Sequence, residues 1–380
     1  MIDFSLTEEQ KAIQAMARDF VKKEIIPVAK DYDLNAEMPW PVIKKAFEVG
    51  LWNLNVPEEF GGEGLDSHVT EAIVAEELAY GCLGIYGAFG GTGLALTPVL
   101  LAGTDEQKKK TLRWFCNEPR LAAFALTEPN AGSDVSAMAT TARREGGEYV
   151  INGSKCFITH GGIADLYVVF ATVDKSKGIK GISAFIVPGN HPGISSGKKE
   201  DKLGDRASHI GDVVLEEVRV PVENRLGEEG QGFSIAMSTL DCTRPTIGAA
   251  AVGVARRALE EACRYAKERE QFGRPIATQQ AIQFMVADIA MGIESARNLV
   301  WKAAWCIDSG QVSPLHSAMS KCYASDMAMQ SAVDALQIFG GYGYMKDYPM
   351  EKLMRDIKIT QIYEGTNQIL RVVIARELLK

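Results

Sequence analysis

A single carboxylate stands out in the stretch QIYEGTNQ, residues 361–368, near the end of the chain. Glu364 lies between Tyr363 and Gly365, and no lysine or arginine is next to it in the sequence. A carboxylate kept away from cations and from water can act as a general base near neutral pH, because burial raises its pKa toward the working range. The alternative is that Glu364 is a solvated surface side chain. This stretch by itself does not decide between a general base and a surface residue.

Two further stretches carry side chains that could hold a ligand. In FALTEPNAGSD, residues 124–134, a strand is expected to end at Thr127 and Pro129 to stop it. The loop Asn130–Ser133 then offers hydroxyl and backbone N–H groups to a planar ring or a phosphate, although an ordinary solvated turn is the favoured interpretation of this segment alone. The run REQFG, residues 269–273, closes a helix, where an arginine and an aromatic residue usually serve as cap and plug.

The common nucleotide-binding motifs are missing. No G-x-G-x-x-G follows a strand, and no Walker sequence is present. The glycine-rich runs at residues 90–93 and 340–343 lie in helical surroundings, where turns are the favoured interpretation. Rossmann and P-loop mechanisms are therefore disfavoured, and a flavin, if bound, has to be held by another arrangement.

Metal, nucleic-acid and membrane functions also find little support. The seven cysteines are scattered singly, and the five histidines form no H-E-x-x-H motif, so no metal site is expected. A formal charge of −8 without a basic stripe disfavours nucleic acid and anionic lipid as partners. We find no apolar run of the ~18 residues needed to cross a bilayer. The N-terminus resembles neither a signal peptide nor a transit sequence, so a cytoplasmic location is expected.

The elements that position these residues fall into three blocks, which we expect to be domains. Residues 1–120 have helical patterning, with Thr7 and Gln10 placed as a capping box. Residues 121–225 carry short β-like runs, and Asn152-Gly153 predicts a hairpin between two of them. Residues 226–380 hold three long helical stripes and a final helix from about residue 366, which predicts a four-helix bundle. The stripes are apolar on most sides, so contacts with other subunits are expected to cover them.

The order and spacing of the motifs over the whole chain resemble the acyl-CoA dehydrogenase family, closest to its medium-chain and short-chain branches. The matching stretches are LTEPNAGSD, FITHGG, VRVP, LDCTRP, REQFGRPI, QIFGGYGY and KITQIYEGTNQI. The resemblance implies a mainly α fold with a central β domain: a helical N-terminal domain, a middle β-barrel-like domain and a C-terminal four-helix bundle. It also implies a homotetramer, assembled as a dimer of dimers.

The resemblance assigns the base and the substrate contacts. Glu364 matches the carboxylate that removes the α-proton of an acyl-CoA thioester, and some relatives instead carry the base at the position of Thr243, which cannot serve here. The backbone N–H of Glu364 and a ribityl hydroxyl of the flavin would meet the charge on the thioester oxygen. The other residues that the resemblance assigns to substrate or CoA are Ser133, Asp241, Arg244, Tyr363 and Gly365.

The same resemblance implies FAD held across a subunit interface, which would explain the missing Rossmann motif. Residues matched to the ring-binding strand, loop and adjoining segment are Phe124, Leu126, Thr127, Ser133, Phe157 and Thr159. Those matched to the FAD of a neighbouring subunit are Arg269, Phe272, Gln280, Gln337 and Gly341, and those matched to its adenosine-diphosphate portion in the same subunit are Thr366 and Gln368. Relatives often have Trp at Phe157, Tyr at Phe124 and Thr or Ser at Gln271, so stacking on the flavin and its redox tuning are expected to differ.

The implied function is FAD-dependent dehydrogenation of an acyl-CoA to a trans-2-enoyl-CoA, as in fatty-acid β-oxidation, with electrons passed to electron-transfer flavoprotein. Alternatives are a dehydrogenase of a cyclic or branched acyl-CoA, an acyl-CoA oxidase, and a catalytically silent flavin- or CoA-binding assembly protein. The run YGAFGGTGL, residues 86–94, matches the region of the acyl pocket. Its glycines Gly87, Gly90 and Gly91 either open the pocket to longer, branched or alicyclic groups or serve helix packing, and both interpretations stand equally.

Overall fold

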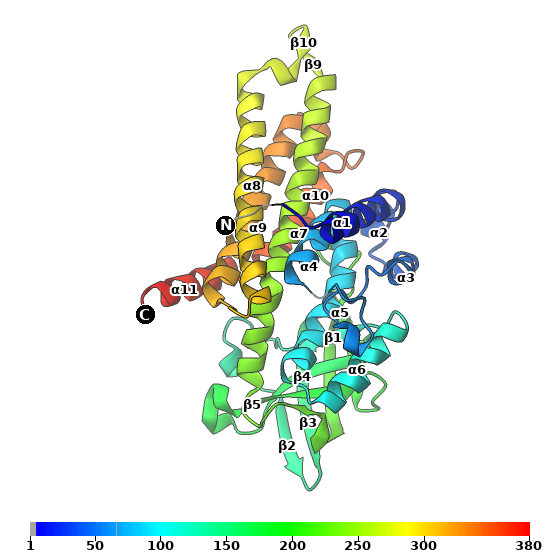
Figure 1. Ribbon diagram of the computed structural model, residues 1–380, viewed down its shortest axis with the longest axis vertical. Helices are drawn as coiled ribbons and strands as arrows, with labels where there is room; N and C mark the ends of the chain where they lie inside the picture. Colours follow the sequence, from blue (N-terminus) through cyan, green and yellow to red (C-terminus); the bar gives the residue numbers. More distant parts are fainter. Residues whose placement is uncertain (1–4, 66) are drawn as a thin grey trace.

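The computed structural model describes residues 5–65 and 67–380. Figure 1 shows a sheet at one end of the molecule, a bundle of long helices at the other, and the N-terminal helices packed along the side of the junction between them. The predicted mainly α fold with a central β domain is confirmed.

The N-terminal helices form the first layer. Their bounds are α1 (Glu8–Phe20), α2 (Ala29–Asn35), α3 (Trp40–Glu48), α4 (His68–Gly81), α5 (Leu83–Ala102) and α6 (Asp105–Asn117). Helix α1 begins at the predicted capping box, in which Thr7 and Gln10 each accept a hydrogen bond from the backbone N–H of the other. Helices α4 and α5 are buried around most of their circumference, because they pack between α1, the sheet and the bundle.

Helix α5 corrects two sequence-based expectations. It carries no charged residue, and by length and composition alone it could cross a membrane, so the statement that no apolar run is long enough was wrong. The structure buries 61% of its most apolar window inside the molecule, which makes it a core helix. Residues 90–93 continue the helix instead of forming the favoured turn. Packing explains this at Gly91, where a Cβ would lie 2.5 Å from Cγ2 of Thr159.

The central sheet has the strand order β6-β7-β3-β2-β4-β5-β8, and β1 pairs with β4 in parallel. The bounds are β1 (Ala122–Ala125), β2 (Thr141–Glu145), β3 (Glu148–Thr159), β4 (Leu166–Thr172), β5 (Ile182–Pro188), β6 (Ile194–Lys199), β7 (Ile210–Pro221) and β8 (Arg225–Leu226).

The hairpin predicted at Asn152-Gly153 was wrong, because β3 runs straight through these residues and the chain turns at Gly146-Gly147 instead. The pairing register of β3 with β7 shifts between Ile151 and Gly153, which marks a bulge. Gly153 has φ +153°, and a Cβ there would lie 2.4 Å from Oγ1 of Thr140. Glycine is therefore required at position 153 because the backbone packs closely against Thr140. An Asn-Gly pair in the sequence does not distinguish this packing requirement from a hairpin turn.

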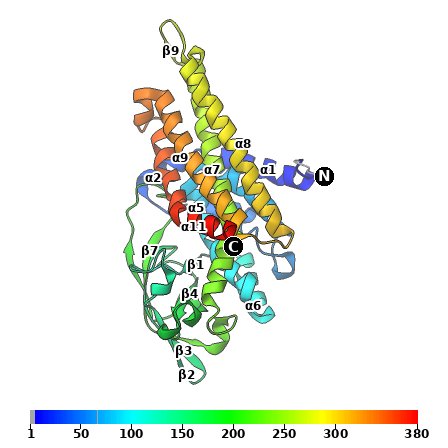
Figure 2. The same ribbon diagram turned by 90° about the vertical axis from the view of Figure 1, so that its left-hand side faces the viewer.

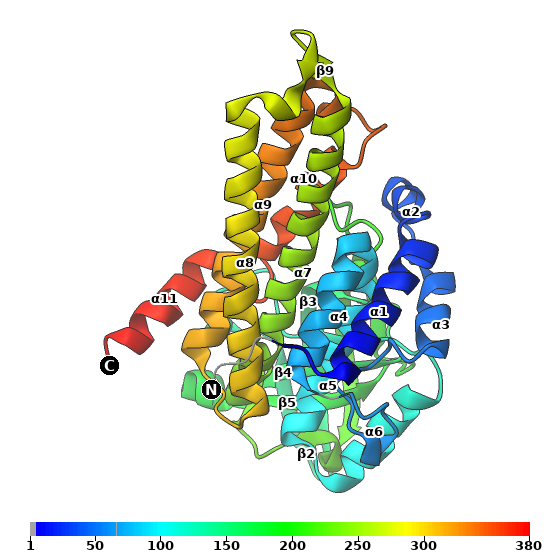
Figure 3. The same ribbon diagram turned by 45° about the horizontal axis from the view of Figure 1, so that its top comes forward.

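The C-terminal bundle is built on three long helices that lie side by side in Figures 2 and 3. They are α7 (Gly232–Glu268), α8 (Gln280–Asp308) and α9 (Pro314–Phe339), and the short strands β9 (Glu270–Gln271) and β10 (Arg274–Pro275) form the tip between α7 and α8. A 3-10 turn at Gly340–Tyr344, a turn as predicted, leads to α10 (Met350–Ile357). The last helix, α11 (Asn367–Leu378), is capped by Thr366, whose hydroxyl accepts a hydrogen bond from the N–H of Ile369.

One buried histidine lies where the helical layer meets the sheet. The two ring nitrogens of His160 lie 2.9 Å from the carbonyl oxygen of Ala122 on β1 and 3.2 Å from that of Ala88 on α5. The residue is fully buried and has φ +63°. It therefore links α5 to the start of the β domain through backbone groups.

Candidate active site

Glu364 lies in the turn between α10 and α11, facing the N-terminal half of α7. The hydroxyl of Thr243 on α7 donates a hydrogen bond of 2.9 Å to Oε2 of Glu364. Thr243 was excluded as a base by its chemistry, yet it holds the carboxylate of the candidate base. The side chain of Glu364 is half-buried, so the carboxylate is held from one side and accessible from the other.

The backbone around Glu364 is fixed by two cations. Nε of Arg244 donates to the carbonyl oxygen of Glu364 at 3.1 Å, and Nζ of Lys321 on α9 donates to that of Gly365 at 2.8 Å. Glu364 has φ +52° and Gly365 has φ +95°, conformations that cost a non-glycine residue energy. Contacts from two bundle helices hold this turn in a conformation that sequence alone does not favour.

Lys321 is a functional candidate that sequence inspection missed. It is fully buried, and its ammonium also donates to Oδ1 of Asn367 at 3.0 Å. Burial lowers the pKa of Lys321 to about 8, against the opposing effect of Glu364. The available signal was a lone lysine among the small residues of the stretch SAMSKCYAS, a composition that predicts burial.

The electrostatics of the turn suit a general base. Burial raises the pKa of Glu364 above its ordinary value, while the Thr243 hydrogen bond and the charges of Arg244 and Lys321 partly offset this rise. Both cations bind backbone oxygens, so neither neutralises the carboxylate by direct pairing. Glu364 is therefore a candidate general base.

Arg244, which binds the carbonyl oxygen of Glu364, is paired with Asp241 on the same helix. They form an ion pair of 2.8 Å, and both are largely buried on α7. Tyr363 precedes the base in the same turn, and burial raises its pKa well above the ordinary value, so the phenol stays neutral. The structure therefore brings together Glu364, Gly365, Tyr363, Asp241 and Arg244.

The residues matched to a flavin ring lie on β1, on β3 and in the loop that follows β1. Phe124 on β1 is half-buried with its ring 4.9 Å from that of Phe170, whereas Phe157 on β3 is 65% exposed at φ +57°. Ser133 lies in an exposed loop, whereas Leu126 is buried. Two aromatic faces and an adjacent hydroxyl-bearing loop are the kinds of group that a planar isoalloxazine needs, so these residues fit the cofactor.

A buried ion pair holds that loop to the sheet. Lys155 on β3 donates to Oε1 of Glu128 at 2.8 Å and to the carbonyl oxygen of Leu126 at 3.1 Å. The carboxylate of Glu128 also accepts the N–H groups of Ala139 and Thr140. The carbonyl of Thr127 accepts the N–H of Cys156. Neither Lys155 nor Glu128 was singled out from the sequence, because a pair 27 positions apart leaves no local pattern.

The remaining matched residues lie elsewhere. Arg269, Phe272, Gln280, Gln337 and Gly341 gather at the β9–β10 end of the bundle, opposite the sheet in Figure 1. The guanidinium of Arg269 lies 5.3 Å from the ring centre of Tyr342, and Phe272 is 94% exposed. Within one chain they do not meet Phe124 or Phe157. Thr366 and Gln368 begin α11 beside the base.

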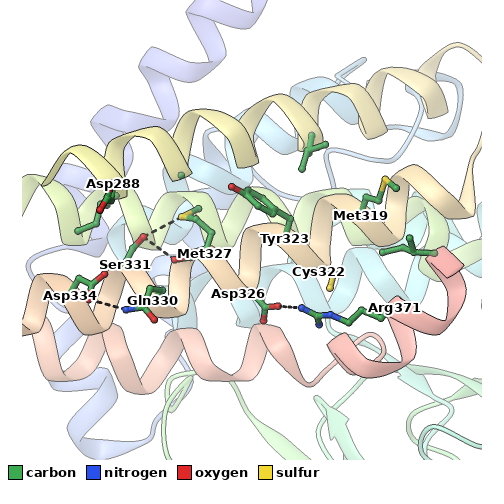
Figure 4. Close-up of a pocket in the computed structure, with 14 residues that line it drawn as sticks. Asp288, Met319, Cys322, Tyr323, Asp326, Met327, Gln330, Ser331, Asp334 and Arg371 are labelled. Atoms are coloured by element: carbon green, nitrogen blue, oxygen red, sulfur yellow. Dashed lines mark hydrogen bonds and ion pairs between the residues drawn. The ribbon is translucent and has the colours of Figure 1, made fainter. Parts of the chain in front are cut away.

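A groove of about 650 Å³ opens on the outer face of the bundle, separate from Glu364. Figure 4 shows the side chains of α9 that line it, with Arg371 of α11 paired to Asp326 at 2.6 Å. Met319, Tyr323 and Met327 are among the residues that line it. The face is apolar and uncovered within a single chain.

Comparison with known proteins decides the family. Three family models match in order: acyl-CoA dehydrogenase N-terminal domain over residues 7–118, middle domain over 123–218, and C-terminal domain over 230–379. The chain belongs to the acyl-CoA dehydrogenase family. It is an oxidoreductase, and the cofactor of this family is FAD.

The relatives of this acyl-CoA dehydrogenase are similar over their full length. An acyl-CoA dehydrogenase of Bacillus subtilis is 46% identical over 379 residues, covering 98% of this chain and 99% of the relative. A short-chain-specific acyl-CoA dehydrogenase of Clostridium acetobutylicum is 45% identical over 381 residues and 100% of both chains. The solved butyryl-CoA dehydrogenase of Megasphaera elsdenii superposes with a TM-score of 0.97 at 43% identity, again over 100% of both.

One further solved structure concerns electron transfer. A chain in the work on the electron transferring flavoprotein of Acidaminococcus fermentans is 47% identical, with a TM-score of 0.97 over 100% of both chains.

Proposed function

We propose that this acyl-CoA dehydrogenase oxidises an acyl-CoA thioester to the trans-2-enoyl-CoA, with Glu364 as the base. The observation that carries the proposal is the carboxylate of Glu364, half-buried, raised in pKa and held by Thr243 without a direct cation partner. Glu364 takes the α-proton, the C–H bonding pair becomes the new double bond, and the β-hydrogen leaves with its electrons. FAD, when bound, supplies the acceptor for that hydride.

The residues around Glu364 have roles that follow from their contacts. The backbone N–H of Glu364 is available to the thioester oxygen, and one such donor is commonly worth roughly 3 kcal/mol in the transition state. Arg244 and Lys321 bind the carbonyl oxygens of Glu364 and Gly365, which holds the backbone of the turn that carries this N–H. Asp241, Arg244 and Ser133 would contact the CoA portion.

Electron-transfer flavoprotein is the acceptor that we propose, supported by the relative studied with that protein. An oxidase of the same fold would instead consume oxygen and release peroxide. The two are separated by following oxygen in an anaerobically reduced sample on admission of air, where a dehydrogenase reoxidises slowly and an oxidase within seconds.

We also propose a homotetramer in which FAD bridges two subunits. The support is the separation of the matched residues within one chain: Phe124 and Phe157 lie on the sheet, whereas Arg269 and Phe272 lie at the opposite end of the bundle. The exposed apolar groove on α8, α9 and α11 is a second face that other subunits would cover.

The decisive test is Glu364→Gln. The amide keeps the size of the side chain and can still accept the Thr243 hydrogen bond, but it cannot take a proton. Flavin reduction by a substrate acyl-CoA should fall by ~10²- to 10⁴-fold, while FAD content and CoA binding persist. An unchanged reduction rate would remove Glu364 as the base, and a wild-type flavin unbleached by every thioester would favour the silent binding protein.

A further inference from the structure

Residues on both sides of Glu364 bind one carboxylate oxygen on α9. Before the base, Nε2 of Gln361 donates a hydrogen bond of 2.6 Å to Oδ1 of Asp326. After the base, Nδ2 of Asn367 donates to the same oxygen at 2.7 Å. The two hydrogen bonds therefore draw the ends of the turn at residues 361–367 together against α9. We call this pair of hydrogen bonds the Asp326 staple.

Asp326 can accept both donors because its carboxylate stays ionised. Burial raises the pKa of Asp326, but the hydrogen bonds that it receives hold that pKa below the ordinary value, and their donors are Arg371, Asn367 and Gln361. An ionised carboxylate acts only as an acceptor and has room for several donors. Its second oxygen, Oδ2, accepts a hydrogen bond of 2.6 Å from the guanidinium of Arg371, a pair that Figure 4 shows.

The Asn367 end of the turn is firmly held. The residue is 2% exposed, and its Nδ2 also donates to Oγ of Ser325 at 2.8 Å. Its Oδ1 accepts Nζ of Lys321 at 3.0 Å, and the same ammonium binds the carbonyl oxygen of Gly365. Moving this amide would leave buried donors and acceptors without partners, which is energetically unfavourable. This end of the turn is therefore a fixed point on α9.

The Gln361 end of the turn is held less firmly. Gln361 is partly exposed, and its Oε1 accepts Nζ of the exposed Lys358, a residue of the same 3-10 turn, at 2.8 Å. The hydrogen bond that joins its side chain to α9 is the one to Asp326. Glu364, with φ +52°, lies between this end and the fixed one. The staple therefore limits how far the turn that carries Glu364 can open.

We infer that Asp326 is a positioning residue, and that the staple sets where the carboxylate of Glu364 meets the α-carbon of the thioester. The inference rests on the proposed function and adds a residue to its machinery. Asp326 lines the groove on the outer face of the bundle, which is separate from Glu364, so Asp326 acts through the turn and does not touch the substrate. A misplacement of ~1 Å in a reacting group can cost ~10²-fold in rate.

The experiment measures the limiting rate of flavin reduction and the Kd of the acyl-CoA, by rapid mixing with the FAD-loaded enzyme. The substrate is whichever of butanoyl-, octanoyl- and cyclohexanecarbonyl-CoA reduces the wild type fastest. Gln361→Met keeps the length of the side chain but removes the donor to Asp326. We expect the limiting rate to fall by ~10- to 100-fold, with the Kd and the FAD content unchanged.

Lys358→Met is the matched control. It removes the other partner of the Gln361 side chain, leaves the staple intact and should keep the wild-type rate.

Two substitutions of Asp326 test the other side of the staple. Asp326→Ala removes the acceptor and should lower the limiting rate at least as far as Gln361→Met. Combining the two should cost nothing further, because both break the same contact. Asp326→Asn keeps an oxygen for Gln361 and Asn367 but loses the charge that pairs with Arg371, so it should restore most of the rate.

Gln361→Met alters a partly exposed side chain, so the test does not depend on the folding of Asp326→Ala. A wild-type rate in Gln361→Met, an equal loss in Lys358→Met, or a loss confined to the Kd or the FAD content would overturn the role of the staple. A wild-type flavin that none of the three thioesters reduces would instead overturn the proposed function.

Discussion

At the scale of single residues, the proposed base Glu364 depends on partners that do no chemistry themselves. Thr243 donates to the carboxylate of Glu364, and Arg244 and Lys321 hold the backbone of its turn. The hydrogen bond from Thr243 lowers the pKa of Glu364, against the larger rise caused by burial. Thr243 is thus a positioning residue that also keeps the base deprotonated.

Thr243→Val should therefore raise the pKa of Glu364 and move the acid limb of the kcat/KM profile to higher pH. Activity needs the carboxylate, so the loss should be larger at pH 6 than at pH 8. Thr243→Ser keeps the hydroxyl and should restore the wild-type profile. A uniform loss at every pH would show that the threonine acts through packing alone.

At the scale of elements, the loop that would meet the flavin is anchored by the Lys155–Glu128 pair. Lys155→Met leaves a buried carboxylate with backbone N–H partners but no cation, and breaking such a pair typically costs about 3–5 kcal/mol. Urea unfolding at neutral pH measures the loss. Adding Glu128→Gln to Lys155→Met should recover part of it, and equal stability of the single and double variants would contradict this account.

The contact between α5 and β1 should make the enzyme sensitive to acid. Burial lowers the pKa of His160 to about 4, from 6.5 in the unfolded chain. Below pH 6.5 the unfolded state binds a proton that the folded state does not, so stability is complete above 6.5 and is lost as the pH falls toward 4. The loss reaches about 3 kcal/mol for this residue alone. Urea unfolding from pH 7 to pH 4.5 should show it, and His160→Gln should flatten that slope.

At the scale of the whole molecule, cofactor retention should depend on assembly. Phe272 is 94% exposed at the bundle tip, far from Phe124 and Phe157 of its own chain. Phe272→Ala should weaken FAD retention by about tenfold, as for an aromatic contact at an interface, without changing the unfolding of a single chain. The test is to dilute the protein and measure the release of FAD together with the molecular mass of the protein, which reports its assembly state. Full FAD retention by a monomeric species would contradict it.

The sequence predicted the elements well where their signals were local. The capping box at Thr7, the end of α7 before Arg269 and the cap at Thr366 all depend on residues close in the chain. The turn assignments at Gly153 and Gly91 were wrong because glycine is required there by close contacts with Thr140 and Thr159, respectively. Each threonine is remote in sequence from the glycine it approaches.

The supporting contacts of the site were not predictable in the same way. Lys321 with Gly365 and Lys155 with Glu128 each join residues 27 or more positions apart. Such pairs produce no periodicity and no motif. They become visible only when the packing of α5, α7 and α9 is known.

Helix α5 has a consequence for the handling of the protein. Its uncharged, strongly apolar length is tolerable only while neighbouring helices and the sheet cover it. When heat separates these layers, α5 becomes exposed to water and to other chains, although it has the composition of a bilayer-spanning helix. We expect exposed α5 segments to aggregate faster than the protein refolds. We expect the durability of this enzyme to be governed by the rate at which α5 becomes uncovered, so that anything that slows the separation of these layers should protect it.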